Sequence, residues 1–436
     1  MNWCKHLGAF VVLLMGVCAP AAAEKILFIP LDNRPVSLAY TTDSFRKAGV
    51  QVVTPPESLL ASDRQSGDPE KLARWLDQEA RGARGAVVSV DSYIYGGLVP
   101  SRTHELDSAV LARRVEDLLA FQSRHPGVPL YAFATVMRSP RWSSAPAEPA
   151  YYAQYGPQIF RWGQLRDRQR LGQLTRKEKK ELAQVEKALP LDIRRDVLER
   201  RKKNLFVLKG LTRGLERGKL DYLLIGRDDS APYSEAHRDA EDLAAFADPA
   251  FRHKFRSFSG ADELGMVLLN RAMNKARGET PLVYAWYNGG AGPATVPSYE
   301  DGPIRRSFRE HVLAAGGFPA RTDKRADLVL GRTGSPGGPM SRPTGRNWMK
   351  WDGSSWPRPG STWKKAGTWG SPTWLLATEA AGPWWKPSSG RKGTGSLWGT
   401  VWGPMPDGIP PATAWGTPWA RGCSGRTSVT GTGRIS

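Results

Sequence analysis

Short apolar segments that end in polar residues alternate with amphipathic segments, and this alternation most narrows the folds open to the chain. The clearest apolar segments are 25–31, 85–90, 131–137, 222–226 and 282–286. The amphipathic segments are 37–47, 69–79, 106–124, 235–246, 262–277 and 304–315. Strands that alternate with helices are typical of βαβ units. We therefore predict an α/β protein whose mostly parallel sheet is flanked by helices.

The first 23 residues predict a secretory signal peptide. They contain one lysine, Lys5, then an apolar run over residues 7–17 and an Ala-Ala-Ala ending at Ala23. The run is too short to cross a bilayer, so we expect no transmembrane segment after cleavage; an uncleaved anchor is the alternative. Two of the three cysteines would leave with this peptide, so we expect no intrachain disulfide. The mature protein is expected to be periplasmic or secreted.

A basic helical segment separates two α/β parts. Residues 24–138 and 219–330 are expected to form these parts, and residues 139–218 a helical insertion or lid that is broken near Pro190. The formal charge of +20 gathers in this insertion and in residues 331–436, a distribution that argues against a nucleic-acid partner. A solvated helical hairpin is the favoured interpretation of the insertion, and contact with an anionic polymer is the alternative.

Two adjacent acids at the end of a predicted strand are the candidate catalytic residues, Asp228 and Asp229. Two ionised carboxylates so close raise one another's pKa, which suits a proton donor beside a charged stabiliser. Glycosidases need such a pair, and a strand-end Asp-Asp is similar to the pair of substrate-assisted N-acetylhexosaminidases. The alternative is structural: Asp229 would cap the next helix, and Asp228 would pair with Arg227 or Arg138.

Polar and aromatic side chains after the other strands are the candidate ligand-binding residues. The carboxyl ends of parallel strands lie at one edge of a sheet, so we expect these side chains to converge there. Arginine fits carboxylate or phosphate groups, aspartate and asparagine fit hydroxyls or amides, and aromatic rings stack on sugars. Buried ion pairs and core packing are the alternatives. The candidates are Asp32, Asn33, Arg34, Asp91, Tyr95, Arg102, Arg138, Tyr287 and Asn288.

One helix offers possible metal ligands. His237 and Glu241 lie four residues apart and share a face, so with Asp228 and Asp229 they could bind a divalent ion. A helix-surface ion pair explains them more simply, and the other histidines show no ligand spacing. The chain contains neither a phosphate-cradling glycine motif nor a Gly-x-Ser-x-Gly elbow. We therefore predict no metal and no cofactor.

Five ordered motifs resemble a known family. They are Ile-Pro-Leu-Asp-Asn-Arg-Pro-Val at 29–36, Asp-Ser-Tyr-Ile-Tyr-Gly-Gly-Leu-Val-Pro-Ser-Arg at 91–102, Arg-Asp-Asp-Ser-Ala-Pro-Tyr at 227–233, Gly-Ala-Asp-Glu at 260–263 and Tyr-Glu-Asp at 299–301. Over about residues 25–330 the chain resembles the bacterial domain-of-unknown-function family 4127. This resemblance implies no particular mechanism.

The composition changes after Leu330. Residues 331–436 hold twelve of the seventeen tryptophans among glycine, proline, serine and basic residues, without helical or strand periodicity. Read from the third base of each codon, residues 404–410 allow Tyr-Ala-Gly-Trp-Asn-Thr, which matches a late motif of the family that is otherwise absent. We therefore predict that this tail is irregular, either disordered or translated out of frame. A natural Trp-rich polymer-binding tail is the alternative.

These features favour a hydrolase that acts on a carbohydrate-containing polymer, with Asp228 and Asp229 as acid and stabiliser. The expected partner is a glycan or another small polar ligand. A non-catalytic glycan- or solute-binding protein is the alternative from a different class, and a metal-dependent hydrolase is the third hypothesis.

Overall fold

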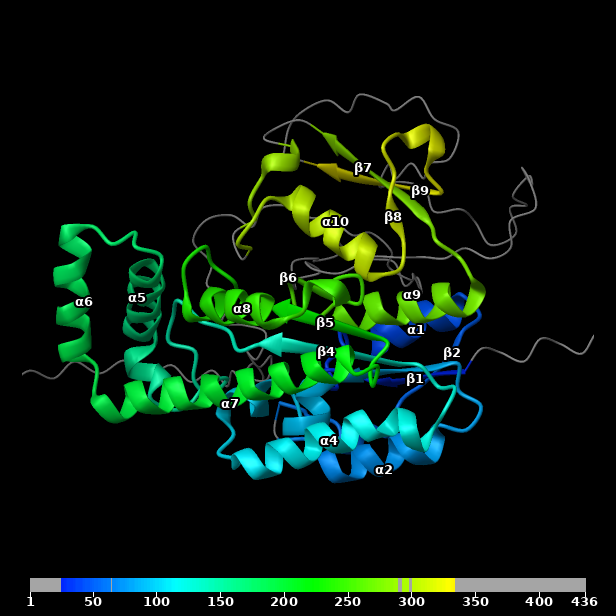
Figure 1. Ribbon diagram of the computed structural model, residues 1–436, viewed down its shortest axis with the longest axis horizontal. Helices are drawn as coiled ribbons and strands as arrows, with labels where there is room; N and C mark the ends of the chain where they lie inside the picture. The colour runs from blue at the N-terminus through cyan, green and yellow to red at the C-terminus, as the bar shows by residue number, and fades with distance from the viewer. Residues whose placement is uncertain (1–24, 64, 289–291, 298–299, 334–436) are drawn as a thin grey trace, which may run out of the picture.

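A six-stranded parallel sheet forms the centre of the molecule. The computed structural model describes residues 25–63, 65–288, 292–297 and 300–333 (Figure 1). The sheet has the order β2-β1-β3-β4-β5-β6, and every neighbouring pair is parallel. Its strands are β1 (Lys25–Ile29), β2 (Gln51–Val53), β3 (Gly85–Ser89), β4 (Leu130–Val136), β5 (Tyr222–Arg227) and β6 (Phe255–Ser259). The predicted α/β fold with a mostly parallel sheet is confirmed.

Helices cover both faces of this sheet. One face packs against α2 (Pro69–Glu79), α4 (Ser108–Arg124), α7 (Leu191–Glu216) and α8 (Glu235–Phe246). The other face packs against α1 (Ala39–Lys47), α9 (Leu264–Arg277) and α10 (Ile304–Ala314). Leu27 and Ile29 of β1 point to the first face, and Ile26 and Phe28 to the second. Burial on both faces explains why the four central strands, β1, β3, β4 and β5, are continuous apolar segments in the sequence.

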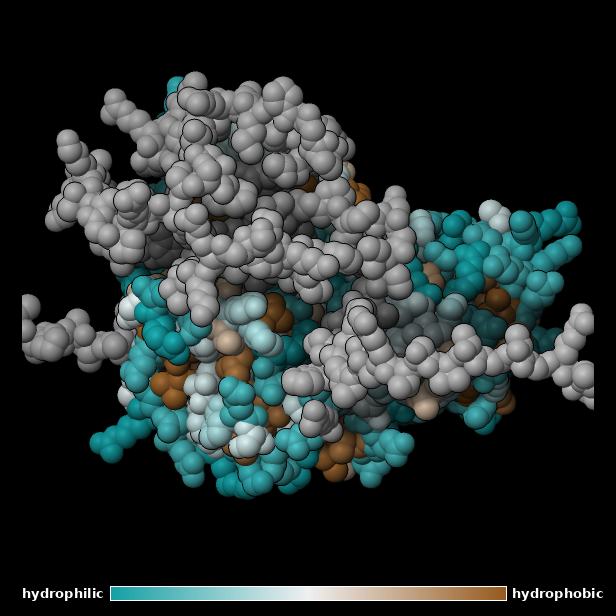
Figure 2. All heavy atoms as spheres, turned by 180° about the vertical axis from the view of Figure 1, so that it is seen from behind, coloured by the Kyte–Doolittle hydropathy of each residue, from teal (hydrophilic) through white to brown (hydrophobic). Residues whose placement is uncertain are grey.

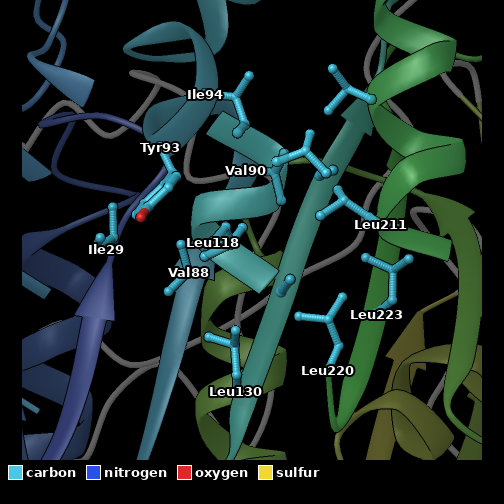
Figure 3. Close-up of a cluster of buried hydrophobic side chains, with 14 of the residues drawn as sticks. Ile29, Val88, Val90, Tyr93, Ile94, Leu118, Leu130, Leu211, Leu220 and Leu223 are labelled. Carbon is cyan, nitrogen blue, oxygen red and sulfur yellow. The ribbon is translucent and has the colours of Figure 1, made fainter. Parts of the chain in front are cut away.

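The core on the first face joins helices to strands that are distant in sequence. Figure 3 shows Leu118 and Leu211, from α4 and α7, beside Val88 and Leu223 of the strands. All four side chains are 0% exposed. Each buried side chain of this size contributes roughly 1.5–3 kcal/mol, so this contact fixes α4 and α7 on the sheet.

The last described strands form a second sheet. Its order is β8-β7-β9, with β7 (Leu282–Asn288) between β8 (Phe318–Pro319) and β9 (Leu328–Thr333), all parallel. The expectation that segment 282–286 would end at the edge of the main sheet is wrong, because this strand pairs with β8 and β9 instead. Among residues 282–287 only Val283 is buried, which fits a strand covered on one face. β9 also continues to Thr333, three residues past the expected start of the tail.

The insertion consists of α5 (Tyr152–Arg170), α6 (Arg176–Ala188) and the first half of α7. These helices share a small core of their own, centred on Ile159, Trp162 and Leu182. The second half of α7 belongs to the main core, so one continuous helix anchors the insertion to the sheet. Figure 1 shows α5 and α6 projecting beyond the sheet. The predicted break near Pro190 is confirmed, since this residue precedes the first turn of α7.

Two expectations fall on parts of the chain that are not described, the signal peptide and almost all of the Trp-rich tail. Within the described ranges, no helix is long and apolar enough to cross a membrane.

Candidate functional site

Charged side chains from five loops meet at the edge where the main-sheet strands end. In an open parallel sheet ligands bind at this edge, next to the point where the strand order reverses. Here the order reverses between β1 and β3, whose following loops both contribute to the site. We use the name carboxyl-edge cluster for the acids and arginines that meet there, Asp32, Arg34, Arg102, Arg138, Glu148, Asp228, Asp229 and Asp262.

Arg34 bridges two acids in the first half of the cluster. Its Nε donates to Asp32 Oδ2 at 2.7 Å, and its Nη2 donates to Asp262 Oδ1 at 2.6 Å. Burial acts against the charge of Arg34, but Asp262 and Asp32 outweigh it and raise the pKa of this guanidinium. Asp262 reaches Arg34 because α9, which follows it, packs across β1, β3 and β4. The loops after β1 and β6 are therefore joined.

Glu148 holds two arginines together in the second half. It accepts from Arg138 Nε at 2.6 Å and Nη2 at 3.1 Å, and from Arg102 Nη1 at 3.4 Å. Each arginine then donates to one of the candidate catalytic acids: Arg102 to Asp228, and Arg138 Nη1 to Asp229 Oδ2 at 2.8 Å. The side chain of Glu148 is only 1% exposed, whereas those of Asp228 and Asp229 are 21% and 18% exposed. The two aspartates thus lie where the cluster meets solvent.

Asp229 occupies an unusual backbone conformation. Its φ is +44°, the only positive value among the described residues other than glycine. Such a conformation costs roughly 1 kcal/mol or more and is concentrated at functional sites. Desolvation and the neighbouring charge of Asp228 raise the pKa of Asp229 to about 6, against the opposing effect of Arg138. At neutral pH and below, Asp229 can therefore exchange a proton.

Neither aspartate has the structural role given above as its alternative. Ser234, not Asp229, caps α8, because its hydroxyl oxygen accepts the His237 N–H at 3.0 Å. Arg227 does not pair with Asp228. It forms a two-pronged ion pair with Asp301 at 2.7 and 2.8 Å, which ties the chain after β7 to the end of β5.

Asp91 is buried at the carboxyl edge and links two neighbouring strands. It starts a short π-helical turn, Asp91–Tyr95, and is 2% exposed. Its two carboxylate oxygens accept from the backbone N–H and the hydroxyl of Thr135 at 2.9 and 3.0 Å. Burial raises the pKa of Asp91 to about 6 despite these bonds. Asp91 joins the end of β3 to β4 and is placed to stiffen the site.

We expect Asp91→Asn to change how stability depends on pH. An acid whose pKa rises from 3.8 to about 6 on folding stabilises the fold below pH 4, and this contribution is lost as the pH rises through 6. The loss amounts to about 3 kcal/mol. Asparagine can keep both contacts with Thr135. The stability of Asp91→Asn, measured by urea unfolding, should therefore rise relative to that of the natural protein between pH 4 and pH 7. Asp91→Ala, which loses both bonds, should be destabilised at both pH values. An Asp91→Asn effect independent of pH would contradict this role.

The remaining predicted ligand-binding residues lie in different settings. Asn33 is half-buried in the loop after β1, and its backbone N–H donates to Ala61 O at 3.0 Å. Tyr95 is buried, with its ring 4.8 Å from that of His104, so it packs in the core. Tyr287 and Asn288 end β7 and therefore belong to the second sheet.

His237, one of the possible metal ligands, pairs with an acid on another helix. His237 Nδ1 lies 2.6 Å from Asp167 Oδ2 on α5, and this contact raises the pKa of His237. Its closest ion-pair partner is therefore Asp167 and not Glu241. Across the described ranges no group of three or more histidine, cysteine, aspartate or glutamate residues could hold a metal ion.

Sequence reasoning did not select Glu148, Asp262 or Arg201 for the site. Asp262 stands in one of the five motifs quoted above, which could have drawn attention to it. Glu148 lies in the loop that leads from β4 into the insertion, and nothing local distinguishes it. Arg201 of α7 donates to the carbonyl oxygens of Met137 and Arg138 at 2.7 and 3.1 Å. It thereby holds the backbone that presents Arg138.

Comparison with known proteins gives a family but no activity. No curated protein and no solved structure matches the chain. A family model described as "Protein of unknown function (DUF4127)" matches residues 26–342, which is well over half of the sequence. The chain belongs to the DUF4127 family.

Proposed function

We propose that the protein is an exported hydrolase that cleaves glycosidic bonds in a carbohydrate-containing polymer at the carboxyl edge of its main sheet. Asp229 would donate a proton to the leaving oxygen, and Asp228 would stabilise the positive charge that develops on the sugar ring. A water molecule would then add its oxygen to the anomeric carbon and return a proton to Asp229. Asp262, whose side chain is 30% exposed, would accept hydrogen bonds from hydroxyls, while the buried Asp32 would hold Arg34 in place.

The observation that carries the proposal is the unequal environment of two adjacent acids. The pKa of Asp229 is raised to about 6, whereas Asp228 accepts a charge-assisted hydrogen bond from the buried Arg102. Two carboxyl groups whose surroundings differ in this way can act as proton donor and charged partner at the same pH. The pair is also partly exposed and rigidly held, as a reacting pair must be.

Asp229→Asn tests the proposal. We expect the mutant to cleave the polymer about 100- to 10,000-fold more slowly, because it cannot protonate the leaving group. The natural enzyme should lose activity as the pH rises above about 6, since Asp229 must be protonated to act. Turnover would be measured on a panel of polysaccharides as reducing ends released, with circular dichroism to check that the fold is intact. Full activity of the mutant would exclude this role.

A substrate with an activated leaving group separates the two acids. Dinitrophenolate leaves without protonation, so Asp229→Asn should retain most of its activity on dinitrophenyl glycosides. Asp228→Asn should lose activity on both kinds of substrate, because charge stabilisation is needed for either. Equal losses in both mutants on both substrates would contradict the assignment of separate roles.

Binding without turnover would support the alternative, a non-catalytic glycan- or solute-binding protein. Fully exposed and unpaired aspartates would have favoured that alternative. Asp228 and Asp229 are instead each paired with an arginine and only 21% and 18% exposed, which supports the enzyme.

A further inference from the structure

The insertion is a strongly positive arm that begins at the site. Residues 139–218 contain 19 lysines and arginines against 9 acids, whereas residues 24–138 and 219–330 together contain 29 against 30. The arm starts directly after Arg138, at the end of β4, so it rises from the carboxyl edge. Figure 2, in which the arm lies at the right, shows hydrophilic side chains over its surface.

Helix α6 sorts its charges onto two faces. All three of its glutamates contact α5: Glu181 pairs with Arg161 at 2.7 Å, Glu178 with Arg168 at 3.3 Å, and Glu186 accepts from the Trp162 indole at 3.2 Å. The same inward face buries Leu182. The acids of α6 are therefore each paired with a side chain of α5.

The fully exposed charged residues of α6 are all cations. We call this set the α6 cationic face; its residues are Arg176, Lys177, Lys179, Lys180 and Lys187, all exposed. Arg176, Lys180 and Lys187 fall within a sector of about 40° and span about 16 Å along the helix. None of the five forms an ion pair within the described part of the chain. Like charges at this spacing repel one another, and a bound polyanion would relieve that repulsion.

We propose that the α6 cationic face binds a linear anionic polysaccharide, one that carries carboxylate or sulfate groups. Three features favour this occupant. Three of the cations, Arg176, Lys180 and Lys187, form a narrow row, which fits a chain better than a plane. The apolar side of α6 is packed against α5, so the helix has no apolar surface to insert into a membrane. It also has no aromatic residue on which a nucleic-acid base could stack.

The test measures binding to polygalacturonate by the full chain at low salt. The variant K177Q/K179Q/K180Q/K187Q removes four charges but keeps good helix formers. We expect it to bind at least about tenfold more weakly and with a smaller dependence on salt, because fewer counterions are released. Binding does not require turnover, so failure here would be distinct from failure of the proposed hydrolase.

A matched control removes four exposed cations elsewhere, R81Q/R84Q/K275Q/K324Q. This variant has the same net charge as the α6 variant, and we expect it to bind polygalacturonate nearly as well as the natural protein. Equal losses in the two variants would overturn the proposal, because binding would then follow net charge alone. Neutral dextran, duplex DNA and vesicles containing phosphatidylglycerol complete the comparison. A stronger α6-dependent interaction with DNA or vesicles than with polygalacturonate would also overturn it.

Discussion

Replacing Glu148 with glutamine is expected to destabilise the protein by about 3–5 kcal/mol. Glu148 is the carboxylate shared by Arg102 and Arg138, and its side chain is almost fully buried. Without its charge the buried Arg102 and the partly buried Arg138 repel each other with no carboxylate between them. Burial lowers the pKa of Arg102, and the charge of Arg138 lowers it further. The amide nitrogen of glutamine would also face an arginine N–H, placing donor against donor. Urea unfolding followed by circular dichroism measures the loss.

Glu181→Gln is the matched control. Glu181 also accepts two hydrogen bonds from one arginine, Arg161, at 2.7 Å each, but its side chain is 34% exposed. An exposed pair of this kind contributes about 1 kcal/mol or less. A second experiment combines Glu148→Gln with Arg138→Met, which removes one of the two arginines that repel each other and should recover part of the loss. Equal effects of Glu148→Gln and Glu181→Gln would show that Glu148 does not hold the cluster together.

Local signals in the sequence were sufficient to locate most elements. The α2 helix begins after Asp68, whose side chain accepts the Lys71 N–H at 3.0 Å, and its bounds agree with the predicted segment. Strands β1, β3, β4 and β5 are apolar on both faces and end in polar residues, so the sequence indicated their positions. The edge strands β2 and β6 are partly exposed and mixed in composition, and they were not predicted. Helix α9 begins at Leu264, two residues later than expected, because residues 261–263 form a turn that carries Asp262.

Pairing between distant segments could not be read in this way. Segment 282–286 has the composition of a core strand, and nothing in it indicates that its partners are β8 and β9. The candidate acids illustrate the same limit. Their place at the end of β5 was predictable, but their contacts depend on Glu148 and Arg102, which are 80 and 126 residues away in sequence from Asp228. A contact of this kind depends on the strand order, which composition does not encode.

We expect Gly226→Ala to disrupt the fold and the site together, at a cost of about 3 kcal/mol or more. Gly226 lies near the end of β5, directly before Arg227 and the two candidate acids. A Cβ at this position would lie 2.3 Å from the carbonyl oxygen of Gly260 and 2.5 Å from Leu264 Cδ1. The leucine can rotate, but the carbonyl belongs to the turn that leads into α9. That turn would have to move, and Asp262, two residues further on, would be drawn away from Arg34.

Gly85→Ala makes the same change at the start of another strand of the same sheet, β3, and serves as the control. Its Cβ would meet two Tyr131 ring atoms at 3.3 and 3.8 Å and the Pro129 carbonyl oxygen at 3.6 Å, so we expect a loss of about 1 kcal/mol or less. Thermal unfolding compares the two mutants, and the proposed glycan-cleaving assay reports on the site. The clash at Gly226 is with a backbone atom. Gly226→Ala should therefore lose stability and activity, whereas Gly85→Ala should keep both. Equal stability of the two mutants would mean that the turn at residues 260–263 can shift freely, and the contact between Asp262 and Arg34 would then not be a fixed part of the site.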